Sequence, residues 1–153
     1  MVRLLLTRGL LDRALAVLRE ELRAAPKNAD LLRVIVRIHR AMGNEAAALG
    51  DIATGLGHVP EHPGLLADRA AMMMDAKRWT EAEADIRTLM RLEPAEEAWP
   101  RELARCFMDG GRFADGIAQL EAVRDRNPAD PKRWWDIVYA YTDRGMHAEA
   151  VPA

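Results

Sequence analysis

Four prolines recur along the chain at a constant spacing of 34 residues: Pro26, Pro60, Pro94 and Pro128. Proline stops a helix, because it lacks a backbone N–H and disfavours the α conformation at the residue before it. A helix stop that returns at one fixed period indicates that the chain repeats a single structural unit. We therefore expect a stack of short units in which each unit packs on its neighbours.

Other positions keep the same period. A column of small residues predicts the place where the two helices of each unit come close, and it consists of Ala14, Ala48, Ala82, Gly116 and Ala150. A second column predicts a tight turn at Gly9, Gly43, Gly111 and Gly145, with Lys77 in the third unit. The repeated unit is thus a helix, a turn and a second helix.

The stretch from Ala76 to Pro94 shows this plan most clearly. Thr80 is expected to cap a helix and Glu83 to complete a capping box. Apolar residues then recur at helical spacing at Ala82, Ile86, Leu89 and Met90. Pro94 is expected to end the helix.

Applied to the whole chain, the pattern predicts an all-α fold of nine or ten helices without strands. The expected ranges are 1–8, 11–23, 30–42, 45–56, 63–76, the helix after Thr80, 97–108, 113–126, 131–144 and a short segment at 147–153. Seven residues should be buried, namely Leu18, Ile35, Ile52, Ile86, Leu103, Leu120 and Ile137.

A 34-residue helix–turn–helix unit with these landmarks resembles the tetratricopeptide repeat family. The family's early aromatic or leucine position is filled by Leu32, Leu66 and Trp134, with Pro100 in the fourth unit. Its later aromatic position is filled by His39, Met73, Phe107 and Tyr141. The resemblance implies a right-handed superhelix, or α-solenoid, in which residues 1–153 form one array. Its parts are a partial unit 1–28, full units 29–62, 63–96 and 97–130, and a partial unit 131–153.

Composition favours a soluble protein of the cytoplasm. The net charge of −2 gives no general attraction for nucleic acid. Cys106 is the only cysteine, so no internal disulfide can form. The apolar run near Met1 is too short for a signal peptide or a membrane span. Of the 22 basic residues only Lys27, Lys77 and Lys132 are lysines, which suggests a GC-rich bacterial genome.

No arrangement of residues in the sequence indicates catalysis, a metal or a cofactor. His58 and His62 are four residues apart, but Pro60 lies between them and places them in a loop. His39 occupies a packing column, and Cys106 lies among packing positions within a helix. We expect both to be buried and without chemical function.

Candidate binding residues lie on the first helix of each unit, which the family resemblance places along a concave groove. They are Arg33, Arg37 and Arg40 in the second unit, Met74 in the third, Arg101, Arg105 and Met108 in the fourth, and Trp135 and Tyr139 in the fifth. Arginine binds carboxylates with two parallel hydrogen bonds, and aromatic residues anchor apolar side chains. The expected ligand is a protein or peptide with acidic residues and one bulky apolar residue.

A second interpretation assigns the same arginines to structure. An acidic column runs along the same helices, at Asp68, Glu102 and Asp136, and again at Asp75, Asp109 and Asp143. The latter three fall near helix C-termini, where the helix dipole disfavours an anion. Arginines of the preceding unit are their expected partners. Ion pairing between repeats and binding of a ligand both remain open at this point.

Two functions are consistent with the sequence. The first is a non-catalytic scaffold that holds a peptide segment or a partner helix in its concave groove. The second is the repeat portion of a larger bacterial enzyme, such as a sulfotransferase or glycosyltransferase, that presents substrate. The sequence begins and ends out of phase with its repeat, so we also expect self-association through uncapped ends.

Overall fold

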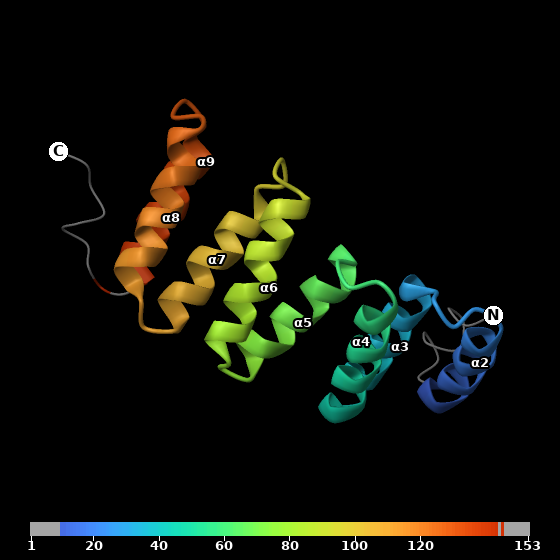
Figure 1. Cartoon of the computed structure of the whole chain (residues 1–153). Coiled ribbons are helices and arrows are strands. Elements are labelled where there is room, and N and C mark those ends of the chain that lie inside the picture. The colour runs from blue at the N-terminus through green and yellow to red at the C-terminus, as the bar shows by residue number, and fades with distance from the viewer. Residues whose placement is uncertain (1–9, 144, 146–153) are drawn as a thin grey trace. The chain divides into compact units, whose positions relative to one another are not determined.

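The computed structural model describes residues 10–143 and residue 145, and these residues form eight α-helices and no strand (Figure 1). The helices are α2 (Leu11–Ala24), α3 (Ala29–Ala41), α4 (Glu45–His58), α5 (Pro63–Asp75), α6 (Trp79–Leu92), α7 (Ala98–Asp109), α8 (Phe113–Asp125) and α9 (Pro131–Asp143). The predicted segments 1–8 and 147–153 lie outside the described residues. The all-α fold class is confirmed.

The helices follow the period of the sequence. The second helices of successive units, α2, α4, α6 and α8, begin at Leu11, Glu45, Trp79 and Phe113, which are 34 residues apart. Pro100 lies in the first turn of α7, as predicted, where its missing N–H removes no helical hydrogen bond. None of the helices between Leu11 and Asp143 has the length and apolar character needed to cross a bilayer.

The predicted turn positions have backbone angles that glycine favours. Gly43 has a φ of 71° and Gly111 a φ of 85°, and Lys77 in the same column has a φ of 57°. In each case the next N–H donates to a carbonyl five residues earlier: Asn44 to His39, Arg78 to Met73 and Arg112 to Phe107. These bonds satisfy carbonyl groups that the end of a helix leaves without a partner. No helix runs through these turns.

The predicted capping box at Thr80 is wrong. Helix α6 begins two residues earlier than predicted, at Trp79, and its N-cap residue Arg78 makes no side-chain capping bond. Thr80 therefore lies inside the first turn. Glu83 instead accepts hydrogen bonds from Arg87 Nε and Arg112 Nη1, each at 2.8 Å. The two arginines bind different oxygens of the carboxylate, and a charged donor is a stronger partner than a backbone N–H.

The chain divides into two compact units, Met1–Met72 and Met73–Ala153. In the first, α2 and α3 share a core cluster of Ala14, Leu18, Ile35 and Ile38. Helix α3 begins with Asn28, whose side chain accepts the Leu31 N–H at 3.0 Å and caps the helix. Asn44 caps α4 in the same way through the Ala47 N–H, at 3.3 Å.

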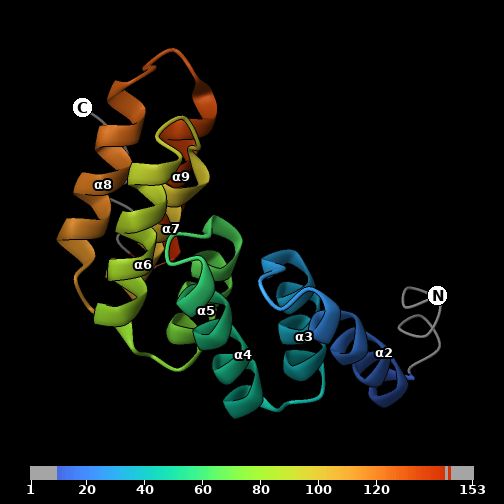
Figure 2. The ribbon, with the colours of Figure 1, turned by 45° about the vertical axis from the view of Figure 1, so that its right-hand side comes forward.

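In the second compact unit α6, α7 and α8 lie side by side, as both views show (Figures 1 and 2). A core cluster of Ala104, Leu120 and Ile137 joins α7, α8 and α9. All seven residues predicted to be buried are buried, two of them in the first unit's cluster and two in this one. Apolar burial at about 25 cal/mol per Å² drives this packing.

The column of small residues, as far as the structure describes it, lies at buried helix contacts. Ala14, Ala48 and Ala82 have no exposed surface, and Gly116 is also buried. A Cβ atom on Gly116 would lie 2.9 Å from the backbone oxygen of Ala104 and would overlap Met108 Cγ. Backbone cannot move aside as a flexible side chain can. Glycine at position 116 therefore sets the distance between α7 and α8.

This contact predicts opposite effects for two glycine-to-alanine changes. Gly116→Ala should lower the free energy of unfolding by about 1 to 3 kcal/mol, because α7 and α8 must separate to admit the methyl group. Gly50→Ala should raise it by up to about 1 kcal/mol, because position 50 is exposed, lies within α4 and has no atom within 4 Å of the new Cβ. Urea denaturation of both variants measures the difference. Equal effects of the two changes would contradict the assigned contact.

Candidate functional site

Two arginines on the first helices of their repeats form ion pairs with the next 34-residue repeat. In the first compact unit, Arg33 Nε donates to Asp68 Oδ2 at 3.0 Å. In the second, Arg101 Nε donates to Asp136 Oδ2 at 2.7 Å. In both pairs the partners are 35 residues apart. The structural interpretation of the arginines is confirmed for these two pairs, which link one repeat to the next.

Gly64 lies against the Arg33 guanidinium. A Cβ atom there would overlap Arg33 Nε, so the flexible arginine side chain would have to shift. The residue at the corresponding arginine position of the third unit is Ala67, which cannot form a pair. Glu102 instead pairs with Arg105 on its own helix, at 2.6 Å. Arg105 Nη2 also lies 4.0 Å from Met74 Sδ.

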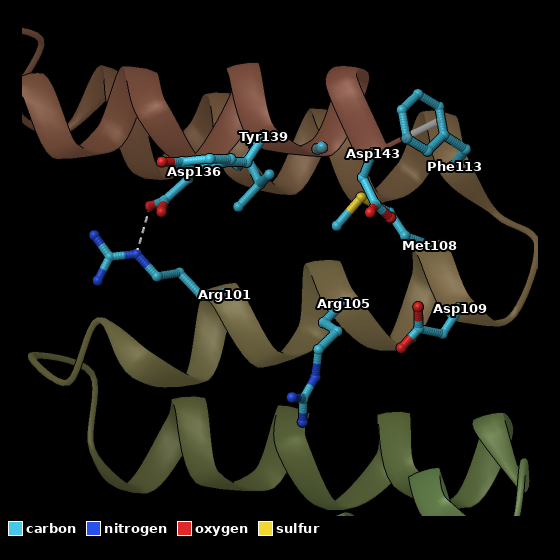
Figure 3. Close-up of a pocket in the computed structure, with 10 residues that line it drawn as sticks. Arg101, Arg105, Met108, Asp109, Phe113, Asp136, Tyr139 and Asp143 are labelled. Carbon is cyan, nitrogen blue, oxygen red and sulfur yellow. Dashed lines mark hydrogen bonds and ion pairs between the residues drawn. The ribbon is translucent and has the colours of Figure 1, made fainter. Parts of the chain in front are cut away.

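The second compact unit contains two adjoining pockets between α7 and α9. One has a volume of about 360 Å³, and its lining includes Arg101, Met108, Asp109, Tyr139 and Asp143 (Figure 3). The other has a volume of about 400 Å³ and is lined by Arg101, Lys132, Trp135, Asp136 and Tyr139. We call the two together the α7–α9 groove. Figure 3 shows Arg101 directed toward Asp136, whereas Arg105 extends away from α9.

Five of the nine candidate residues meet at this groove: Arg101, Arg105, Met108, Trp135 and Tyr139. Arg33, Arg37 and Arg40 lie on α3, in the first of the two compact units. Met74 is buried, with 8% of its surface exposed. Lys132 and Phe113 also line the groove but were not predicted. Lys132 lies three residues before Trp135, one helical turn away, and this spacing could have identified it.

Two adjacent tryptophans have different surroundings. Trp134 is held in place: its Nε1 donates to the Pro128 oxygen at 2.9 Å, and the Arg124 guanidinium lies 4.8 Å from its ring centre. Trp135 faces the groove with 57% of its surface exposed, beside Tyr139 with 67% exposed. The ring centres of Trp135 and Tyr139 are 6.0 Å apart. Large exposed aromatic side chains beside a pocket are typical of a binding surface.

A buried arginine of α9 is linked through Glu97 to Arg101 at the groove. Arg133 is 7% exposed, and its Nη1 donates to the Val123 oxygen at 2.8 Å. Its Nη2 pairs with Glu97. Glu97 in turn lies 3.8 Å from Arg101 Nη2. This chain of charges connects α9, α7 and the end of α8, and it restricts the position of Arg101 at the groove.

Asp109 and Asp143 differ from the expectation that arginines of the preceding unit neutralise them. Both are exposed, and neither forms an ion pair within residues 10–143. Arg101 and Arg105 belong to the repeat before Asp143, and they pair instead with Asp136 of α9 and with Glu102 on their own helix. That part of the prediction is wrong for Asp143, because both arginines are already engaged, and for Asp109, because the third repeat has Ala67 where the second and fourth repeats have arginine. Both carboxylates lie at helix C-termini and line the groove.

The remaining residues noted in the sequence have structural roles. His39 is buried, and its Nδ1 lies 2.7 Å from Asp51 Oδ2. Cys106 is buried, its Sγ is 3.5 Å from the Trp79 oxygen, and burial raises the pKa of its thiol. His62 Nδ1 accepts the Leu65 N–H at 3.3 Å at the start of α5. No group of side chains with metal-ligand geometry occurs among the described residues.

The helix dipole predicts the energetic effect of an unpaired carboxylate. Asp109→Asn should raise the free energy of unfolding by roughly 0.3 to 1 kcal/mol at low salt, because it removes an anion from the C-terminus of α7. Asp115→Asn should lower it, because Asp115 lies in the first turn of α8 and accepts a bond from Arg112 Nε at 2.7 Å. Denaturation at low and high salt measures both, and the two effects should shrink together as salt screens them. A loss of stability in Asp109→Asn would reveal a partner for that carboxylate.

Comparison with known proteins agrees with this architecture. Two family models described as tetratricopeptide repeat match the chain, one over residues 1–63 and the other over residues 73–140. A search of curated proteins finds no match.

Solved structures of similar fold cover nearly the whole chain. One is MamA (residues 41 to the end) from Desulfovibrio magneticus RS-1, with 18% identity, a TM-score of 0.77 and coverage of 97% of this chain and 84% of that one. A tetratricopeptide repeat protein from Parabacteroides merdae has 20% identity, a TM-score of 0.79 and coverage of 97% and 58%. Pseudomonas aeruginosa pilF has 16% identity, a TM-score of 0.73 and coverage of 99% and 75%. The 34-residue helix pairs, the two sequence matches and these structures together show that the chain belongs to the tetratricopeptide repeat family.

Proposed function

We propose that the chain is a non-catalytic scaffold that binds a peptide segment of a partner protein in the α7–α9 groove. The observation that carries this proposal is the exposed pair Trp135 and Tyr139 beside the two pockets. Tetratricopeptide repeats support protein interaction in general. At 16–20% identity the solved structures support the fold only, so the argument for this groove comes from its own residues.

The aromatic pair would supply most of the affinity. Tryptophan and tyrosine are enriched among the few residues that dominate binding energy, especially where a pocket excludes water around them. Trp135 and Tyr139 are four residues apart on α9 and present one continuous apolar surface. A bulky apolar side chain of the partner, placed between Tyr139 and Met108, would remove water from both.

An acidic residue of the partner fits the end of the groove near Lys132. Lys132 is exposed and has no ion pair within the described part of the chain. Arg101 uses its Nε for Asp136, but a guanidinium has five N–H donors and can bind a second carboxylate. The internal pair would then hold Arg101 in place for the ligand, so the structural and binding roles of this arginine are compatible.

The arginines of α3 are proposed as a separate contact. Arg37 is exposed and forms no ion pair with any described residue, so it is the best placed of Arg33, Arg37 and Arg40 to bind an acidic partner. Arg33 is engaged with Asp68.

We place the protein in the cytoplasm, in keeping with its single buried cysteine. Self-association is a further proposal.

The aromatic groove can be tested with two neighbouring tryptophans. A randomised peptide library displayed on phage is selected against the full chain, and an enriched peptide is then measured by fluorescence anisotropy. Trp135→Ala and Tyr139→Ala should each weaken its binding by at least tenfold, as expected for central aromatic contacts. Trp134→Ala is the matched control, because it removes an indole from the same helix outside the groove and should leave affinity within about twofold.

Salt dependence separates the charged contacts from the aromatic ones. Replacing Arg101 and Arg105 by Ala should weaken binding more at low salt than at high salt, because exposed charges are screened. Enrichment of no peptide would overturn the proposed function. A loss in Trp134→Ala as large as that in Trp135→Ala would place the binding surface elsewhere.

A further inference from the structure

The two ends of the α7–α9 groove carry opposite charge. The pocket at the Lys132 end is lined by two cations, Lys132 and Arg101, and one anion, Asp136. The pocket at the other end is lined by two cations, Arg101 and Arg105, and three anions. Those anions are Asp136, already bound to Arg101, and Asp109 and Asp143, whose carboxylates have no ion pair among the described residues.

The backbone strengthens this difference. Helices α7 and α9 run in the same direction, because Arg101 pairs with Asp136 near their N-terminal parts while Asp109 and Asp143 line one pocket at their C-terminal ends. Both helix dipoles therefore add positive potential near Lys132 and negative potential near Asp109 and Asp143. The pocket walls carry Met108, Tyr139 and Ala140, whose apolar surface excludes water and lengthens the reach of a charge.

Arg105 does not neutralise the acidic end. Its Nη2 donates to Glu102 at 2.6 Å, and its side chain extends away from α9 in Figure 3. Asp109 and Asp143 thus retain acceptor oxygens at the rim of a cavity that is large enough for a side chain. A carboxylate pair accepts hydrogen bonds from guanidinium or ammonium groups, and a guanidinium can bind it with two parallel bonds.

The length of the groove sets the spacing of the ligand's charges. Lys132 and Asp143 are separated by about 16 Å along α9, at 1.5 Å per helical residue. An extended peptide advances about 3.3 Å per residue. Its charged side chains should therefore be about four or five residues apart, with a bulky apolar residue between them at Tyr139.

We infer that the groove recognises a dipolar peptide, with a lysine or arginine bound by Asp109 and Asp143 and an acidic residue at the Lys132 end. This inference rests on the proposed function and adds to it a basic residue and a fixed order of charges. It assigns to the ligand the two carboxylates that have no ion pair within the part of the chain that the structure describes. A purely acidic peptide would place a like charge against them and bind more weakly.

The test compares two selections from one randomised phage-displayed peptide library, at low salt. Peptides enriched on the unaltered chain should carry a basic residue about four or five positions from an acidic one. Enrichment on the double variant Asp109→Asn, Asp143→Asn should lose the basic residue and keep the apolar one. The control variant Asp115→Asn, Asp125→Asn removes the same two charges from exposed sites on α8 and should select the same peptides as the unaltered chain.

A binding measurement gives the size of the effect. A peptide enriched on the unaltered chain should bind the Asp109→Asn, Asp143→Asn variant roughly threefold to tenfold more weakly at low salt, and the difference should shrink at high salt. The same peptide with its basic residue replaced by serine should bind both proteins equally. Enriched peptides without a basic residue, or an equal loss in the α8 control, would overturn this inference while the proposed function stands. Selection of no peptide would overturn both.

Discussion

The close approach of paired helices at a small residue is the contact on which the rest of the structure depends. Between α7 and α8 this contact is at Gly116, where a Cβ atom would lie 2.9 Å from the Ala104 carbonyl oxygen and would overlap Met108. Because the two helices can approach here, Ala104 and Leu120 form a dry cluster with Ile137 of α9. That cluster fixes α9 against α7, and the space left between them is the groove. A larger residue at position 116 would change the groove as well as the core.

Charge has a different role in the two halves of a repeat. The second helices carry exposed pairs such as Arg78 with Glu81, which contribute little to stability because water screens them. The first helices carry the partly buried pairs Arg33–Asp68 and Arg101–Asp136, which join one repeat to the next. Since these arginines are already engaged, we expect the affinity of the groove to depend on its aromatic surface. Its selectivity should depend on Asp109, Asp143 and Lys132, which have no ion pair among residues 10–143.

Much of the fold could be predicted because the same sequence pattern recurs in every 34-residue repeat. Ile52 and Ile86 share a column, so each prediction of burial supports the next. The capping box at Thr80 was wrongly predicted, because a cap depends on a single residue and on the other partners of its acceptor. Arg112 binds Glu83 more strongly than a backbone N–H could. Ion pairing between repeats was predicted for the carboxylates near helix C-termini, but Arg33 and Arg101 pair with Asp68 and Asp136 instead. The sequence could not show that Asp109 has no ion pair among the described residues, because that depends on which carboxylate each arginine reaches.

The single thiol has a use that follows from its position. Cys106 is 1% exposed, burial raises the pKa of its thiol, and its Sγ lies 3.5 Å from the Trp79 carbonyl oxygen of the neighbouring helix. A thiol reagent can reach it only when α6 and α7 separate, and it reacts with the thiolate that burial suppresses. The labelling rate of the natural protein therefore measures how often this pair of helices opens. The chain carries its own reporter of local unfolding, on the helix that forms one wall of the groove.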